Sequence, residues 1–302
     1  MITPLLLGIL FPALAAGIIW GLGWKLWRPI SKGAEIENGY WSGAVGCALA
    51  VAIGSFGLMG WVGFPPRLAE GWLPFIAGGA ALIALFESLV LRKNWLARAS
   101  IWLVLLAVMV WLLMSPRRSS LSTLEYSAWV GGIAVCAWVG QSVVEALAER
   151  WTGASIPLSL WVWSVGIAAC EALTGSLRYG QLAGVLAAAM GAGFVAALLK
   201  SKIAFSRGAV TIVTSAAYAL LLCGYFYSDL PFASAVILAL APLILWIGET
   251  GVLTRQKQWI VVPARALLIS VPVMVAVLIA AWPMIFTKPA QQGVPSSGPE
   301  TY

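Results

Sequence analysis

Four glutamates interrupt long apolar stretches of the chain, at Glu87, Glu145, Glu171 and Glu249. A charged carboxylate inside a membrane is disfavoured by roughly 2.5–3.5 kcal/mol on insertion scales, so such residues usually face other helices or a water-filled cavity. A carboxylate held in that environment can bind a proton, a cation or a polar solute. These four residues are therefore the first candidates for chemistry in this sequence.

Three of these glutamates, Glu87, Glu145 and Glu249, fall near the C-terminal ends of predicted helices that run in the same direction. The helix macrodipole disfavours negative charge there, and an arginine follows each glutamate within five or six residues. These arginines are Arg92, Arg150 and Arg255. One interpretation is a set of interfacial ion pairs. The other is a shared vestibule in which the three carboxylates converge to bind a cation or a proton.

Glu171 lies among small apolar residues, and Ser164 precedes it by seven residues on the same face of the predicted helix. Arg178, one or two helical turns further on, is the candidate partner for a structural ion pair. The alternative is a functional proton or ligand site. In either case we expect Glu171 to face other helices rather than lipid.

Polar stripes run along two other predicted helices. Gln141 and Glu145 are four residues apart on one face, and Ser215 and Tyr218 lie along a face of a later helix. Such stripes either join helices through hydrogen bonds of about 0.6 kcal/mol on average or line the path of a solute. The candidate substrate-binding set is Glu171, Glu145, Gln141, Ser215, Tyr218, Glu249 and Glu87.

Several classes of chemistry have no support in this sequence. The chain contains no histidine, so histidine-ligated metals and histidine general bases are excluded. Phosphate-binding, dinucleotide-binding and zinc-protease motifs are missing, and Asp229 is the one aspartate. We therefore predict no catalytic residues, no metal and no cofactor. An enzyme that acts on a membrane lipid is the weakest of the functional hypotheses.

The elements that position the candidates are long apolar helices. Hydrophobic residues make up 61% of the chain and charged residues 10%, against about 45–50% and about 25% in soluble domains. Runs of about 20 apolar residues match the hydrocarbon core of a bilayer. The predicted spans are roughly 4–24, 42–62, 72–91, 97–115, 127–147, 156–175, 181–199, 208–227, 231–249 and 264–286. The sequence thus predicts an all-α, polytopic membrane helical bundle.

The predicted organisation is a transmembrane domain over 1–286 and a disordered C-terminal tail over 287–302, which is rich in Pro, Gly and Ser. Of the 18 Lys and Arg residues, 13 lie in or next to alternate connections on one side of the membrane. Positive charge stays on the cytoplasmic side, so we expect both termini on the other side. The net charge of +7 then indicates orientation in a bacterial cytoplasmic membrane, with lipid rather than nucleic acid as the partner.

A regular spacing marks the predicted cytoplasmic corners, where aromatic residues recur at intervals of 54, 56, 54 and 54. The residues are Trp41, Trp95, Trp151, Phe205 and Trp259. Five tandem helical hairpins would produce this pattern. Ten evenly spaced helices with interfacial aromatic side chains would produce it too.

Prolines interrupt three predicted spans, at Pro12, Pro242 and Pro272. Each proline frees a backbone carbonyl one turn earlier, and transporters bind substrates at such broken helices. Many spans, scarce carboxylates and broken helices favour a small-solute transporter or permease. A structural or accessory subunit of a larger membrane complex is the alternative, since polar residues are few and small-residue seams suited to helix packing are present.

Overall fold

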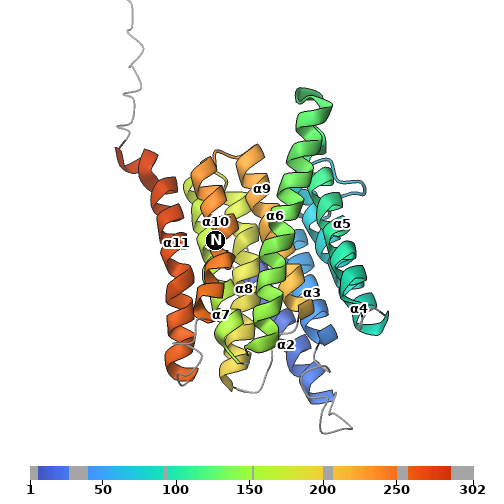
Figure 1. Cartoon of the computed structure of the whole chain (residues 1–302), viewed down its shortest axis with the longest axis vertical. Coiled ribbons are helices and arrows are strands. Elements are labelled where there is room, and N and C mark those ends of the chain that lie inside the picture. Colours follow the sequence, from blue (N-terminus) through green and yellow to red (C-terminus); the bar gives the residue numbers. More distant parts are fainter. Residues whose placement is uncertain are drawn as a thin grey trace, which may run out of the picture.

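The fold of the chain is taken from a computed structural model, which describes residues 6–26, 40–90, 94–151, 153–199, 207–249 and 258–286. Every regular element within these ranges is a helix. The predicted all-α bundle is therefore confirmed (Figure 1). The stretch 287–302, predicted as a disordered tail, lies outside the described residues.

The helices follow one another with short connections. The α-helices are α2 (Phe11–Leu26), α3 (Tyr40–Met59), α4 (Leu73–Val90), α5 (Trp95–Met114), α6 (Thr123–Arg150), α7 (Ser155–Leu173), α8 (Leu177–Leu199), α9 (Arg207–Tyr227), α10 (Phe232–Ile244) and α11 (Gln258–Phe286). The shorter helical segments are η1 (Leu6–Leu10), η2 (Ala69–Trp72), η3 (Ser115–Ser120) and η4 (Leu245–Glu249).

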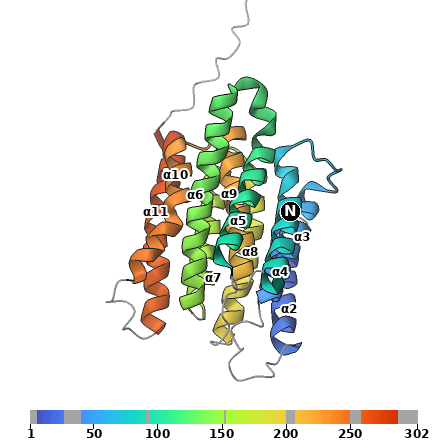
Figure 2. The ribbon, with the colours of Figure 1, turned by 45° about the vertical axis from the view of Figure 1, so that its right-hand side comes forward.

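Nine helical segments in the described ranges are long and apolar enough to cross a membrane, and a shorter apolar helix covers Leu6–Leu22. Together they correspond one to one with the ten predicted spans. Successive helices alternate in direction, so α4, α6 and α8 end at one end of the bundle and α5, α7 and α9 at the other (Figures 1 and 2). The first is called the basic end here, because the connections rich in Lys and Arg join helices there. The second is called the opposite end.

Helix α9 is the central element of the bundle. Of its apolar window, 89% is buried inside the molecule, against 28% for α11. It packs against α3, α4, α6 and α8, with further contacts to α5, α7 and α10. In both views α10 and α11 lie to one side, and α3 and α4 to the other (Figures 1 and 2). Side chains on α9 therefore meet groups from most of the other helices.

The outer helices expose apolar side chains along their length. On α11, Leu267, Val271 and Leu278 are each more than half exposed, whereas Ile269 and Ala276 are fully buried. Trp61, Trp95 and Trp259, near the two ends of the bundle, are also largely exposed. Apolar residues on one helix face and indoles at both ends suit a protein whose surrounding solvent is lipid.

One predicted helix start was wrong, for a local reason. Helix α6 begins before the predicted span because Ser122 and Glu125 form a capping box that satisfies two free backbone amides. The predicted span 231–249 is confirmed as Phe232–Glu249, although it is not one continuous α-helix. It changes to a 3₁₀ segment after Ile244, two residues beyond Pro242.

The predicted hairpins do not pack equally. Helix α2 packs closely on α3, and α10 on α11, whereas α6 makes few contacts with α7 and more with α9 and α10. Backbones approach closely within the first pair, where a Cβ at Gly46 would lie 3.3 Å from the carbonyl oxygen of Ala16. The regular spacing of the corner aromatics is therefore not matched by equivalent packing units.

Candidate functional site

Glu171 lies near the C-terminus of α7, toward the opposite end of the bundle, and is completely buried. Among the residues that the structure describes, neither of its carboxylate oxygens has a hydrogen-bond partner. Its head group projects at α9, where a Cβ on Gly224 would overlap the carboxylate. Gly224 therefore makes the space that Glu171 occupies, and the predicted inward orientation of Glu171 is confirmed.

The arginine expected to pair with Glu171 pairs elsewhere. Arg178 donates to the carboxylate of Glu70 at 3.0 Å, and the Tyr179 hydroxyl donates to the other oxygen at 3.3 Å. Glu70 belongs to the short segment η2, which also packs against α4, α5 and α9. The Glu70 carboxylate thus ties η2 to α8 across the opposite end of the bundle, and Glu171 does without an ion pair to Arg178.

Sequence reasoning missed three residues of this region: Glu70, Tyr179 and Cys223. The carboxylates of Glu70 and Glu171 both act electrostatically on Tyr179 and Cys223, which places the four side chains together. Glu70 was overlooked because it lies in a connection rather than in an apolar run. The signal that could have found it is its place in the run Pro-Pro-Arg-Leu-Ala-Glu, where a single acid stands among turn and apolar residues.

A second polar cluster lies toward the basic end, between α6 and α9. The Gln141 amide donates to the Glu145 carboxylate at 2.9 Å, and its carbonyl oxygen accepts from Ser215 at 3.3 Å. Thr214 approaches the same oxygen at 3.5 Å. The predicted candidates Glu145, Gln141 and Ser215 therefore come together although they lie on two helices far apart in sequence.

Glu87 adjoins this cluster from α4. Its carboxylate accepts the Trp102 indole N–H at 2.7 Å and pairs with Arg98 of α5 at 3.5 Å. The charges of Glu87 and Arg98 both act on Glu145. The expected partner Arg92 lies outside the described residues, and Arg98 pairs with Glu87 in the described part. The buried carboxyl groups of Glu87 and Glu145 and the guanidinium of Arg98 therefore lie close together toward the basic end.

Glu249 belongs to a separate cluster. It pairs with Arg150 at 3.3 Å and with Arg265 at 3.5 Å, and it accepts a hydrogen bond from the Trp151 indole. The guanidinium of Arg265 lies 3.3 Å from the centroid of the Trp151 ring. Trp151 was predicted as an interfacial anchor but is buried, since it packs between these charges. Arg150 was the expected partner of Glu145 and instead pairs with Glu249.

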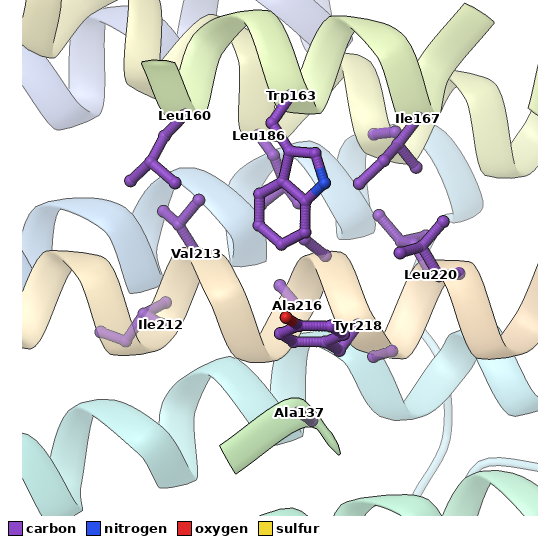
Figure 3. Packing of buried hydrophobic residues seen from close by; sticks show 14 of the residues in the cluster. Ala137, Leu160, Trp163, Ile167, Leu186, Ile212, Val213, Ala216, Tyr218 and Leu220 are labelled. Atoms are coloured by element: carbon purple, nitrogen blue, oxygen red, sulfur yellow. The ribbon is translucent and has the colours of Figure 1, made fainter. Parts of the chain in front are cut away.

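Tyr218 is buried at the middle of α9 beside Trp163 of α7, with the two rings edge to face at 5.5 Å (Figure 3). The Tyr218 hydroxyl donates to the carbonyl of Ala239, and the Trp163 indole donates to that of Leu238. Gly140 of α6 leaves the space for the hydroxyl. We call Trp163 and Tyr218 the aromatic barrier, because they fill the section of α9 between the clusters of Glu145 and Glu171.

Apolar side chains flank the barrier in the close view (Figure 3). Figure 3 shows the Trp163 indole reaching from α7 toward Tyr218 on α9, with Leu160 and Ile167 to either side. Leu160, Trp163 and Ile167 are all fully buried. The two rings therefore pack among apolar side chains, and the clusters of Glu145 and Glu171 meet α9 on either side of them.

Membrane-length apolar helices that expose apolar side chains and bury Glu87, Glu145 and Glu171 define a multi-pass integral membrane protein. Comparison of the chain with models of known protein families, with curated proteins and with solved structures found no match.

Proposed function

We propose that this chain is a small-solute transporter or permease whose path follows α9. The observation that carries the proposal is the state of Glu171, a wholly buried carboxyl group with neither oxygen hydrogen-bonded by any residue in the described ranges. A group of this kind is expensive in a bundle that only has to be stable. We infer that it is retained because it binds something during transport.

A structural role accounts poorly for Glu171. Burying an unpaired carboxyl group opposes folding, so stability alone gives no reason to keep it. Ionised groups that serve structure are paired, as Glu70 is with Arg178 and Glu249 with Arg265. The absence of a side chain at Gly224 also leaves the space that this carboxylate occupies.

The remaining candidates support a path along α9. Glu145, Gln141 and Ser215 form a hydrogen-bonded cluster against α9 toward the basic end, and Glu171 meets α9 toward the opposite end. The barrier of Trp163 and Tyr218 separates them. A solute would meet the first polar cluster from the basic end and Glu171 from the opposite end, and it would pass only when the closed middle opens. Glu87 belongs to the first cluster, while Glu249 has a structural role in its ion pairs.

The location proposed for this protein is a bacterial cytoplasmic membrane, with the basic end facing the cytoplasm and both termini on the other side. The competing function is that of an accessory subunit in a larger membrane complex. The two differ in one physical respect. A transporter must expose the surroundings of Glu171 to water at some stage, whereas a scaffold keeps them sealed.

The test uses Cys223, which is buried on α9 beside Gly224. A variant that retains Cys223 alone, with Cys47, Cys136 and Cys170 replaced by Ala, is reconstituted in sealed vesicles of known orientation. A small cationic methanethiosulfonate reagent that does not cross membranes is added to one side or the other. Transport predicts that Cys223 is modified from both sides, at rates that depend on which end is open.

The matched control retains Cys47 instead, which is equally buried on α3, and is expected to stay unmodified in the folded protein. If Cys223 also stays unmodified from both sides, yet reacts after unfolding in detergent, the site is sealed. That result would refute transport and favour the accessory subunit.

A further inference from the structure

We propose that Glu171 and Glu145 are two proton-binding groups on one path along α9, held apart by the aromatic barrier. The ion coupled to transport is then the proton. This inference rests on the proposed transport function, and it adds the identity of the ion, the order of the sites and the residues that prevent a leak.

The surroundings of Glu171 suit a proton rather than a metal cation. Cations such as Mg²⁺ and Ca²⁺ take about six or more oxygen ligands. The described residues contain no group of three or more Cys, Asp or Glu side chains that could hold such an ion. A proton needs only one carboxylate oxygen and removes the charge on binding. For a carboxylate in an apolar interior, neutralisation is the inexpensive alternative to pairing.

The charged and titratable groups that face Glu171 do not supply a positive charge that pairs with it. From η2 comes Glu70, which is paired with Arg178 of α8. The hydroxyl of Tyr179 donates to Glu70, and the thiols of Cys223 on α9 and Cys170 on α7 also lie near Glu171. Among the described residues, the arginine in this neighbourhood is paired with Glu70, so a proton is what can neutralise Glu171.

A hydroxyl on the same helix extends this polar face. Ser164 lies two turns before Glu171, about 10 Å along the axis at 1.5 Å per residue. Serines inside helices usually bond the carbonyl four residues earlier, but Ser164 is fully buried and its hydroxyl has no hydrogen-bond partner in the described ranges. A second unsatisfied polar atom on the face of Glu171 points to a hydrated or solute-bound state of this surface.

The second proton site is Glu145, which lies at the end of a hydrogen-bonded chain. Ser215 donates to the Gln141 carbonyl oxygen, and the Gln141 amide donates to Glu145. The facing charges are Glu87 from α4 and Arg98 from α5, which pair with each other. As in the cluster of Glu171, one arginine pairs with only one of the two neighbouring carboxylates. Glu145 is left with a neutral amide partner and gains from protonation.

The two sites are too far apart for direct exchange. Ser215 and Gly224 are nine residues apart on α9, about 14 Å at 1.5 Å per residue. Between them lies Tyr218, whose hydroxyl is engaged with the carbonyl of Ala239 and whose ring packs on Trp163. A proton therefore passes only when this barrier moves, which couples its passage to the change of conformation.

The first experiment asks whether Glu171 carries a proton. The purified full chain in lipid nanodiscs is treated with dicyclohexylcarbodiimide, which attacks protonated carboxyl groups in apolar surroundings, and modified peptides are mapped by mass spectrometry. We expect modification at Glu171 that declines as the pH rises, and none at the ion-paired Glu70. Glu171→Gln should abolish modification of that peptide alone.

Infrared spectra of the same samples give a readout that does not require the reagent to reach the site. The protonated carboxyl group of Glu171 should contribute a carboxylic-acid C=O band that Glu171→Gln lacks. The absence of that band, or protection of Glu171 by Na⁺ at constant pH, would overturn the assignment of the proton.

The second experiment asks whether the barrier controls access. In the variant that retains Cys223 alone, Tyr218→Phe and Trp163→Phe each keep an aromatic ring but remove one hydrogen bond to α10. Loss of one bond should raise the rate of Cys223 modification from the basic end by about 2- to 10-fold. Trp161→Phe, on the half-exposed face of α7, should leave the rate unchanged. Equal rates in all three variants would exclude a barrier role.

The outcomes of these experiments distinguish failure of proton coupling from failure of the proposed transport function. If Cys223 is reached from both sides but Glu171 never holds a proton, transport stands and proton coupling fails. If Glu171 holds a proton but Cys223 is sealed on both sides, the protein is not a transporter, and the proton site has no role in coupling.

Discussion

The indole N–H of Trp163 donates to the carbonyl oxygen of Leu238 at 2.8 Å. That carbonyl is the one that Pro242 leaves without its helical donor, because proline has no N–H to give to the residue four positions earlier. A tryptophan from α7 thus completes the backbone of the broken helix α10. The break that the sequence suggested as a ligand site is already occupied by a side chain of the same molecule.

The first prediction follows from this hydrogen bond. Trp163→Phe should destabilise the protein by about 1–3 kcal/mol, because a buried carbonyl loses its only side-chain donor in the described structure. Thermal unfolding in detergent is the measurement. Trp161→Phe is the control, since Trp161 is 39% exposed on the same helix. Equal effects of the two substitutions would show that the bond to Leu238 contributes little.

A second prediction concerns the space for Tyr218. Gly140→Ala should cost about 1–3 kcal/mol because its Cβ would overlap the Tyr218 hydroxyl. Tyr218→Phe in the same chain should recover part of that loss. Gly132→Ala on the same helix meets nothing nearby and should be neutral or slightly stabilising. Chemical denaturation of the wild type and these three variants measures this, and a tolerated Gly140→Ala would mean that α6 and α9 lie further apart.

The contact between Gly224 and Glu171 gives a third prediction. Gly224→Ala should destabilise the wild-type chain, where its Cβ would overlap the carboxylate, but should be tolerated beside Glu171→Ala. A double-mutant cycle should give a coupling of about 0.5–3 kcal/mol. Gly21→Ala, where a Cβ meets nothing, controls for helix propensity. Strictly additive effects would place the Glu171 side chain away from α9.

The ion pair at the opposite end gives a fourth prediction. Arg178→Ala should destabilise the protein by about 1–3 kcal/mol, since the Glu70 side chain is only 9% exposed and loses a charged donor. Glu70→Gln in the same chain should restore part of the loss by removing the unpaired charge. Arg118→Ala, at an exposed position of η3, serves as the control in thermal unfolding. A fully tolerated Arg178→Ala would show that Tyr179 alone suffices to hold Glu70.

A fifth prediction tests orientation. The excess of Lys and Arg at the basic end predicts that both termini lie outside the cytoplasm. Alkaline phosphatase fused after Tyr302 should be active, and green fluorescent protein at the same point should be dark. Fusions placed after Lys200, between α8 and α9, should behave in the opposite way. The reverse result would invert the assignment of the cytoplasmic side.

The sequence by itself determined the helices and the membrane. Runs of about 20 apolar residues require internally bonded helices, because lipid offers the backbone no partner. That constraint is local, so all the predicted spans are present as helices in the structure. The inward orientation of Glu171 and the meeting of Gln141 with Glu145 follow from helical periodicity in the same way.

Only the tertiary structure decided which charged groups pair and which helix lies at the centre. Arg178 was expected to serve Glu171 because it is near in sequence, but Glu70 from a distant connection takes it. Trp151 was read as an interfacial anchor, and Glu249 and Arg265 draw it into the interior. Partner choice in a bundle depends on the packing of helices around α9, where many arrangements share one pattern of apolar runs. Hydrophobicity specifies that a helix crosses the membrane, but it does not specify its neighbours.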